Sequence, residues 1–205
     1  MKDSVIFDFD GTICQSLGLI VECLQKKTSK KLDLEMLRTM TSKEVVEFVG
    51  LSYLELPSMI LDVRKAFKRD LLNQKIVPQI HESILNLKDR GIKLHVLSSN
   101  SEENIKLWLK NNSLENVFDS VNSAFTIFGK SREIKSLLKN RKINKRSCVY
   151  IGDETRDLEA SKSLGLDSIA VSWGYNTLEL LQRFQPSYSC NKPNNICELT
   201  CFSNQ

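Results

Sequence analysis

The sequence predicts an α/β fold, a doubly wound parallel sheet of the Rossmann-like kind, with an all-helical segment inserted after the first strand. Three observations support this prediction. Residues 79–205 alternate short apolar runs with helical patterns, which is typical of a parallel sheet with helices on its faces. Residues 16–78 carry helical patterns only. Acidic and hydroxyl residues follow several of the apolar runs, where open α/β sheets bind ligands.

Length and composition indicate one compact globular protein. The chain has 205 residues, of which 41% are apolar and 26% charged, as in ordinary water-soluble domains. No apolar run is long enough to cross a bilayer, and the first residues lead directly into the first strand, so we expect a cytoplasmic protein with no membrane partner.

The net charge of +4 is mild. Basic runs at 26–31 and 139–146 lack interleaved aromatic residues, which favours solvated helix ends and predicts no nucleic-acid partner.

The six cysteines form no Cys-x-x-Cys pair. This pattern, in a chain with no visible secretion signal, favours reduced thiols. A disulfide or metal site among Cys190, Cys197 and Cys201 is a less favoured alternative.

The first strand is predicted at residues 5–10, and it carries two carboxylates. Asp8 and Asp10 are two residues apart, so on a strand they point to the same side. Two adjacent like charges are costly unless a cation offsets them, which predicts a metal site. Gly11 allows a sharp turn, and Thr12 offers a hydroxyl and an amide beyond it. An ordinary Asp-Gly hairpin is the alternative, whereas a calcium loop of the EF-hand type is excluded because Ile13 stands where its glycine is needed.

The helical segment follows. Apolar stripes run over residues 17–24 and 60–71, and residues 41–44 form a capping box before the helix over 45–49. Pro78 marks the return to the sheet. We therefore assign residues 16–78 to a helical cap, and residues 1–15 and 79–205 to the α/β core.

Two further segments place polar groups at helix starts. The strand predicted at 92–97 opens into Ser98, Ser99 and Asn100, and hydroxyl and amide groups at a helix N-terminus suit a phosphate. Lys130 begins a helix with an apolar stripe at Ile134, Leu137 and Leu138, which brings a cation close to the same edge. Simpler readings stay open here: Ser98 as a helix N-cap, and Lys130 as a solvated surface lysine.

The strand predicted at 147–151 runs into Gly152, Asp153, Glu154 and Asp157. The helix after it ends at Gly165, a typical C-cap. This order places Asp153 and Asp157 at the carboxyl end of a strand, although Asp153 as a simple helix cap is an alternative.

The last elements continue the alternation. Residues 168–171 predict a strand, and residues 176–179 predict a capping box for a helix through Phe184. The tail after Pro186 is expected to pack on the edge of the sheet.

Together these segments resemble the haloacid dehalogenase (HAD) superfamily of phosphotransferases. The matching features are Asp-x-Asp-Gly-Thr at 8–12, the apolar strand that ends in Ser98, Lys130 at a helix start, and Gly-Asp-x-x-x-Asp at 152–157. Residues 171–176 are similar to the phosphoglycolate-phosphatase-like branch. The resemblance implies a HAD core with a helical cap, and a Mg²⁺-dependent phosphatase acting on a small phosphorylated metabolite. Residues 13–16 lack the acid that members of this branch often carry, so the substrate stays open.

The resemblance also implies residue roles. Asp8 would be the nucleophile that forms an aspartyl-phosphate, since a carboxylate is ionised at neutral pH, and Asp10 the general acid and base. The dehalogenases lack a carboxylate at the Asp10 position, which favours phosphoryl chemistry here. The implied phosphate-binding residues are Gly11, Thr12, Ser98, Ser99, Asn100 and the catalytic Lys130. The implied Mg²⁺ ligands are Asp8, Asp10 and Asp153, with Gly152, Glu154 and Asp157 in supporting positions.

Two other functions remain compatible with the same residues. One is a phosphomutase acting on a sugar phosphate, and the other is a catalytically silent HAD-like binding module. The sequence leaves open whether the protein is a monomer or a homodimer.

Overall fold

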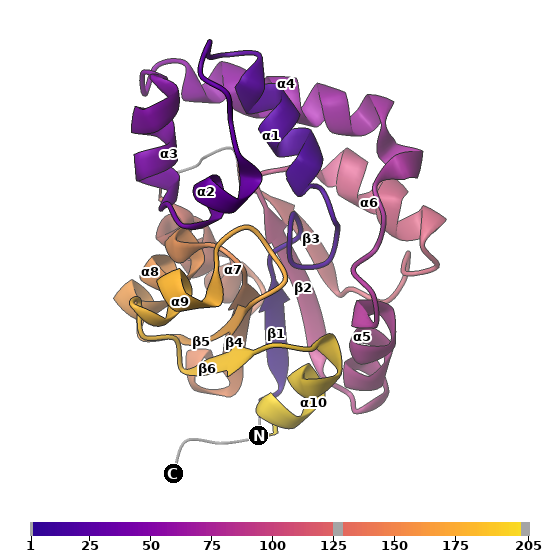
Figure 1. Ribbon diagram of the computed structural model, residues 1–205. Helices are drawn as coiled ribbons and strands as arrows, with labels where there is room; N and C mark the ends of the chain where they lie inside the picture. The colour runs from indigo at the N-terminus through magenta and orange to yellow at the C-terminus, as the bar shows by residue number, and fades with distance from the viewer. Residues whose placement is uncertain (1, 125–128, 202–205) are drawn as a thin grey trace.

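The computed structural model describes residues 2–124 and 129–201. Its centre is a six-stranded sheet with the strand order β3-β2-β1-β4-β5-β6 (Figure 1). All neighbouring strands pair in parallel. The strands are β1 (Ser4–Phe7), β2 (Lys93–Ser98), β3 (Ser120–Ser123), β4 (Cys148–Gly152), β5 (Asp167–Val171) and β6 (Tyr188–Cys190). The predicted α/β Rossmann-like class is therefore confirmed.

The helices fall into an inserted group after β1 and a group that connects or follows the later strands. The inserted helices are α1 (Leu17–Gln25), α2 (Leu34–Arg38), α3 (Ser42–Val49), α4 (Leu56–Arg69) and the 3₁₀ turn η1 (Leu71–Asn73). The connecting helices are α5 (Ile80–Asp89), α6 (Glu102–Asn111), α7 (Lys130–Asn140), α8 (Thr155–Leu164), α9 (Leu178–Gln182) and α10 (Ile196–Leu199), with 3₁₀ turns η2 (Lys145–Ser147) and η3 (Pro193–Asn195).

Helices cover both faces of the sheet. Val5 and Phe7 of β1 belong to a core cluster that includes residues of α5, α6 and α10. Ile6, between them, belongs to a second cluster with residues of α7 and α8. Successive side chains of a strand point to opposite faces. Because both faces are buried, β1 is apolar without interruption, as strands of parallel sheets are.

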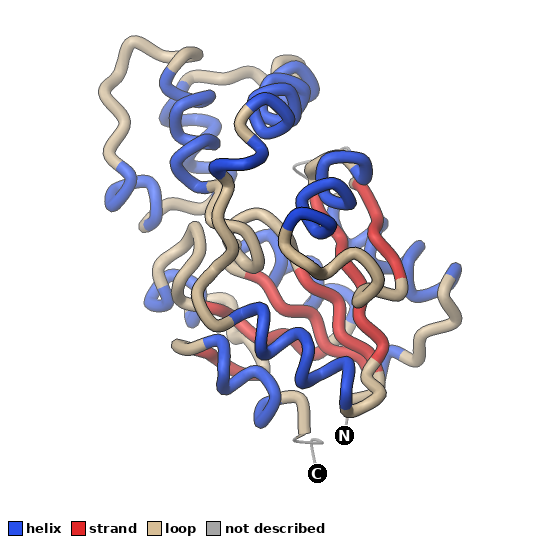
Figure 2. The backbone as a smooth tube through the Cα atoms, turned by 90° about the vertical axis from the view of Figure 1, so that its right-hand side faces the viewer, coloured by secondary structure: helices blue, strands red, loops and turns tan. Residues whose placement is uncertain are grey.

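The inserted helices α1–α4 stand apart from the sheet as one group, joined to it by loops (Figure 2). They contact the loops that follow the strands: Arg64 donates to the carbonyl of Ser99 at 2.8 Å, and Arg38 to that of Ser172 at 3.2 Å. The helical insertion, defined here as α1–α4 and η1, therefore covers the carboxyl edge of the sheet. The division into domains at residues 16 and 78 stays a prediction.

The first strand is shorter than predicted. It ends at Phe7, so the expectation that Asp8 and Asp10 lie on the strand itself is wrong. The amides of Ile13 and Cys14 both donate to the carbonyl of Phe9, at 2.9 and 3.0 Å. This tight turn takes the chain out of the sheet directly after Asp8.

One predicted capping box is confirmed and one is wrong. Thr41 and Glu44 cap α3 reciprocally, as expected. The N-cap of α9 is Thr177, whose side chain accepts from the amide of Leu180, instead of Asn176. Asn176 is used elsewhere: its Oδ1 accepts from the amide of Thr155 at 2.9 Å.

The remaining expectations concern the tail, the cysteines and the membrane. The tail forms β6, which pairs with β5 at the sheet edge. All six cysteines are free thiols, so Cys190, Cys197 and Cys201 form no disulfide. Within residues 2–124 and 129–201, no helix is both long and apolar enough to cross a membrane.

Candidate active site

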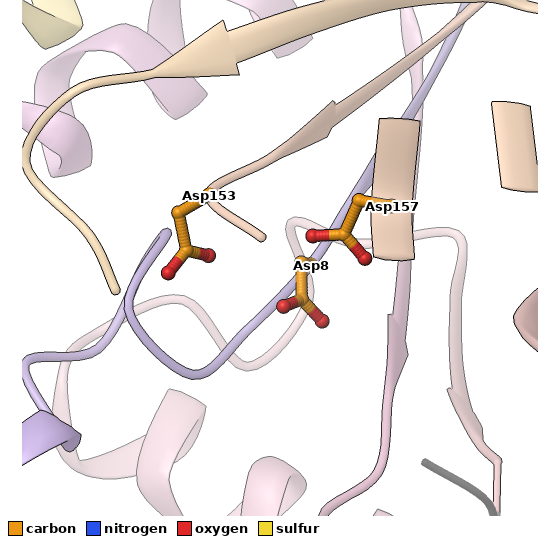
Figure 3. A group of neighbouring side chains, drawn as sticks. All are labelled: Asp8, Asp153 and Asp157. Atoms are coloured by element: carbon orange, nitrogen blue, oxygen red, sulfur yellow. The ribbon is translucent and has the colours of Figure 1, made fainter. Parts of the chain in front are cut away.

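The candidate site lies where the strand order reverses, between β1 and β4. Asp8 directly follows β1, Asp153 directly follows β4, and Asp157 lies on the first turn of α8. Carboxylate oxygens of all three lie within 4.8 Å of one another (Figure 3). This is the topological switch point at which open α/β sheets bind ligands.

Asp8 is buried, with 1% of its surface exposed. Its Oδ1 lies 3.0 Å from Nζ of Lys130, while its Oδ2 has no hydrogen-bond partner among the described residues. Burial raises the pKa of Asp8 to about 7, although the Lys130 charge lowers it. One oxygen is therefore fixed by an ammonium group and the other is open to a reaction partner.

Lys130 is the first residue of α7 and is 4% exposed. Its ammonium group contacts Asp8 and Asp157 and lies 5.2 Å from the ring centre of Tyr150. Burial by itself lowers the pKa of Lys130, but the Asp157 and Asp8 carboxylates raise it above its usual value. The surface-lysine alternative is therefore excluded.

Asp153 is fully buried and held through both oxygens. Its Oδ1 accepts from the hydroxyl of Thr12 and its Oδ2 from the amide of Tyr175, each at 2.6 Å. Burial, followed by the Asp8 charge, raises its pKa. Gly11 and Gly174 enclose it so closely that a Cβ on either would lie 2.1 Å from an Asp153 side-chain atom. Only glycine therefore fits at these two positions without a shift.

Asp10 lies outside this group of three carboxylates. Its Oδ1 accepts from the hydroxyl of Ser16 at 2.7 Å and its Oδ2 from that of Ser98 at 3.1 Å. Burial raises the pKa of Asp10, while the two hydrogen bonds lower it. Asp157, expected in a supporting role, is the third carboxylate of that group, and the expectation that Asp10 is a Mg²⁺ ligand stays a prediction.

The loop after β2 is ordered by its own side chains. The hydroxyl of Ser98 accepts from the amide of Asn100 at 2.9 Å. The N-cap of α6 is Ser101, which excludes the reading of Ser98 as that cap. Nδ2 of Asn100 is buried and has no hydrogen-bond partner among the described residues. It lines the same cavity as Ser99 and Asp10.

Glu154 and its neighbours connect α8 to the helical insertion. Glu154 is the N-cap of α8, so Asp153 is not. Its carboxylate accepts from the hydroxyl of Ser42 at 2.9 Å and pairs with Arg156 at 2.5 Å. Asp157 accepts from the amide of Glu154 at 3.2 Å. A Cβ on Gly152 would lie 2.3 Å from Asp157, so this glycine allows Asp157 to reach Lys130.

Three side chains near the site were missed at the sequence level. Ser16 was noted only for lacking a carboxylate, although a hydroxyl close to Asp10 in sequence was a usable signal. Arg156 stands inside the matched segment 152–157 and was also recognisable. Arg64, on α4, donates to the carbonyl of Ser99, but no pattern in the sequence links these two positions.

The residues present fit a divalent cation. Of the six oxygens of Asp8, Asp153 and Asp157, only Oδ2 of Asp8 lacks a partner among the described residues. Burial raises the pKa of Asp8 and Asp153, and a cation bound beside them would favour their ionised forms. Hard oxygen ligands are what Mg²⁺ prefers. Asp8 keeps an oxygen without a partner among the described residues, and Asp153 is held only by uncharged donors, whereas Asp157 is paired with Lys130. Asp8 and Asp153 therefore fit as ligands best.

Comparisons with known proteins agree with this geometry. The chain is 29% identical over 202 residues to a phosphoglycolate phosphatase of Synechococcus elongatus, with 95% of both chains covered. It is 25% identical to the pyrophosphatase PpaX of Listeria monocytogenes, with 94% of both covered. A predicted phosphatase from Clostridium acetobutylicum has a similar fold, with a TM-score of 0.80, 24% identity, and coverage of 98% of this chain and 97% of that one.

A family model for haloacid dehalogenase-like hydrolases matches residues 5–171. This match spans the strands β1 to β5 and every residue of the candidate site up to Asp157. The chain therefore belongs to the haloacid dehalogenase-like hydrolase family, and within it the chain is similar to proteins named as phosphatases.

Proposed function

We propose that the protein is a Mg²⁺-dependent phosphatase that hydrolyses a small phosphate monoester through a phosphorylated Asp8. The observation that carries this proposal is the unpartnered Oδ2 of Asp8, which is buried beside Lys130. A carboxylate with one anchored and one open oxygen is suited to attack phosphorus. Nothing in the geometry favours the phosphomutase or the silent binding module over hydrolysis.

Charge is the first requirement of this chemistry. A carboxylate at 4 Å from a phosphate dianion is repelled by about 8 kcal/mol at an effective dielectric constant of about 20. Lys130 offsets part of this repulsion because its ammonium group lies 3.0 Å from Asp8. Mg²⁺ bound to Asp8 and Asp153 would offset the rest and hold a phosphate oxygen.

Asp8 acts as the nucleophile and Asp10 transfers the protons. Oδ2 of Asp8 forms a bond to phosphorus while the bond from phosphorus to the ester oxygen breaks. Asp10 donates a proton to that departing oxygen, and the raised pKa of Asp10 favours the protonated acid that this step needs. Water then attacks the phosphorus, Asp10 takes its proton, and phosphate leaves Asp8. Ser16 and Ser98 fix the position of the Asp10 carboxyl group throughout.

The direct test is Asp8→Asn, with Asp89→Asn at an exposed position on α5 as the matched control. Asp8→Asn is expected to lower phosphate release at least about 1,000-fold, because losing a covalent route costs about 4 kcal/mol or more. The control is expected to retain wild-type turnover. Residual Asp8→Asn activity above one part in about a thousand contradicts the nucleophile assignment.

Asp10→Asn tests the acid–base role separately. With acetyl phosphate, whose leaving group needs no proton, this variant is expected to form the phosphoenzyme but to hydrolyse it slowly. Mass spectrometry of the acid-quenched protein should then detect a phosphate on Asp8. A variant that turns over as fast as the wild type would refute the role of Asp10.

A further inference from the structure

The cavity beside Asp10 has an aliphatic wall. It has a volume of about 120 Å³ and is enclosed between the helical insertion and the loops after β2 and β4. Such a volume holds several water-sized groups. The wall comes from α1, α3 and α4 and includes Ile20, Leu24, Val45, Val46, Met59 and Ile60.

Both arginines at this cavity make contacts within the chain. Arg64 donates to the carbonyls of Ser99 and Asn100, at 2.8 and 3.3 Å. Arg156 pairs with Glu154 at 2.5 Å. Both guanidinium groups line the cavity, but their contacts hold the helical insertion, the β2 loop and α8 in place.

The position of Asp10 fixes which part of a substrate meets this wall. Asp10 lines the cavity, and in the proposed reaction it gives its proton to the departing ester oxygen. The organic group on that oxygen therefore extends from Asp10 into the cavity. A carboxylate or a second phosphate there would lose its hydration against aliphatic side chains, which is costly. An alkyl or aryl group would instead displace water from an apolar surface, which is favourable.

We propose that this phosphatase prefers phosphate monoesters with an apolar alkyl or aryl group and discriminates against phosphoglycolate and pyrophosphate. The inference rests on the proposed function, because it takes Asp10 as the acid that faces the leaving group. It separates this chain from the phosphatases to which it is similar, whose names specify charged substrates.

The test is a substrate series with Mg²⁺: ethyl, propyl and butyl phosphate, phosphoglycolate, pyrophosphate and acetyl phosphate. The three alkyl esters have nearly equal leaving groups, so differences in kcat/KM report contacts with the organic part. We expect kcat/KM to rise about fourfold per added methylene and phosphoglycolate and pyrophosphate to fall below ethyl phosphate. A phosphoglycolate or pyrophosphate value equal to or above that of ethyl phosphate overturns the inference.

Two neighbouring residues of α4 provide a matched pair of variants. Ile60 lines the cavity and is 7% exposed, whereas Leu61 faces solvent and is 44% exposed. Ile60→Asn is expected to flatten the dependence on alkyl length, and Leu61→Asn to leave it unchanged. Since Ile60→Asn can also weaken folding, Val63→Thr, a change of similar volume in the same wall, is measured beside it. An unchanged length dependence in folded Ile60→Asn or Val63→Thr contradicts the inference.

Acetyl phosphate shows whether the proposed function fails or only the substrate inference. If the wild-type protein releases no phosphate from acetyl phosphate with Mg²⁺, the proposed function itself fails. If acetyl phosphate is hydrolysed but kcat/KM is independent of alkyl length, only the substrate inference fails.

Discussion

At the scale of single residues, the site is built around buried carboxylates, and neighbouring residues hydrogen-bond or ion-pair with nearly all of their oxygens. Hydrogen bonds from Thr12 and Tyr175 fix Asp153, and Lys130 joins Asp8 to Asp157. Such fixed groups lose little freedom when a reaction partner binds, which favours catalysis by positioning. Close packing around Asp153 is part of that arrangement.

Gly174→Ala tests the packing around Asp153. A Cβ at this position would lie 2.1 Å from Cβ of Asp153, so one of the two segments must move. We expect the required Mg²⁺ concentration to rise, kcat/KM to fall at least about tenfold, and stability to fall by about 1–3 kcal/mol, as in other overpacked sites. Mg²⁺ titrations of activity and chemical denaturation measure these effects.

Gly18→Ala is the matched control for that variant. A Cβ at Gly18, within α1, would meet nothing within 4 Å. Alanine favours a helix over glycine by up to about 1 kcal/mol, so this variant should be as stable as the wild type or more so. An equal loss of activity in both variants would show that packing on Asp153 is not the cause.

At the scale of elements, β2 places one residue at the site and another inside the sheet. β2 ends in Ser98 beside Asp10, while His95 of the same strand is buried and bonded through Nδ1 to Ser120 of β3 at 2.8 Å. Burial lowers the pKa of His95, and the charges of Arg141, Lys93 and Lys88 act in the same direction against that of Asp119. The neutral imidazole is therefore the form that folding favours.

His95 gives the stability of the protein a pH dependence of known sign. Below the unfolded-state pKa of about 6.5, the unfolded chain binds a proton that the folded protein resists. The contribution of His95 to the free energy of unfolding should therefore fall as the pH drops from about 7.5 to about 5.5. The raised pKa of Asp8 acts in the opposite direction in both proteins, so the expected result is that the wild type loses stability relative to His95→Gln. Urea denaturation of both proteins at the two pH values measures the difference, and parallel pH profiles would contradict the prediction.

At the scale of the whole molecule, β1, β4 and the helical insertion meet at one edge of the sheet. Contacts from Arg38, Ser42 and Arg64 tie the insertion to the loops after β2, β4 and β5. The site is thereby covered by helices that a separate part of the sequence supplies. A cation bound at this junction would stabilise the whole fold, because the unfolded chain does not assemble the site.

Metal removal tests that connection. Mg²⁺ at about 100 times its Kd should raise the free energy of unfolding by about 2.7 kcal/mol, with a matching rise in Tm, and a chelator should abolish both the rise and phosphate release. Asp153→Asn should lose the Mg²⁺-dependent rise in Tm, whereas the exposed Asp89→Asn should keep it. Full activity in excess chelator, or an undiminished rise in Asp153→Asn, would rule out a cation at Asp153.

The sequence by itself determined the fold class and the residues around which the site forms. Strand and helix periods are local properties, and a polar residue directly after a buried strand can be recognised without its neighbours. Ser98 and Asp153 were found in this way, Asp8 from its two-residue spacing to Asp10, and Lys130 from the start of a helix. β3 was not, because Ser120–Ser123 is short and mostly polar.

Only the tertiary structure decided which of these side chains contact one another. The chain turns at Phe9, and the carboxylate of Asp10 accepts hydrogen bonds from Ser16 and Ser98. Asp8 and Asp157 both contact Lys130 instead. The apolar wall likewise needs three inserted helices to meet above Asp10. Contacts between segments far apart in the chain depend on packing, and no local pattern of residue types encodes which side chains will meet.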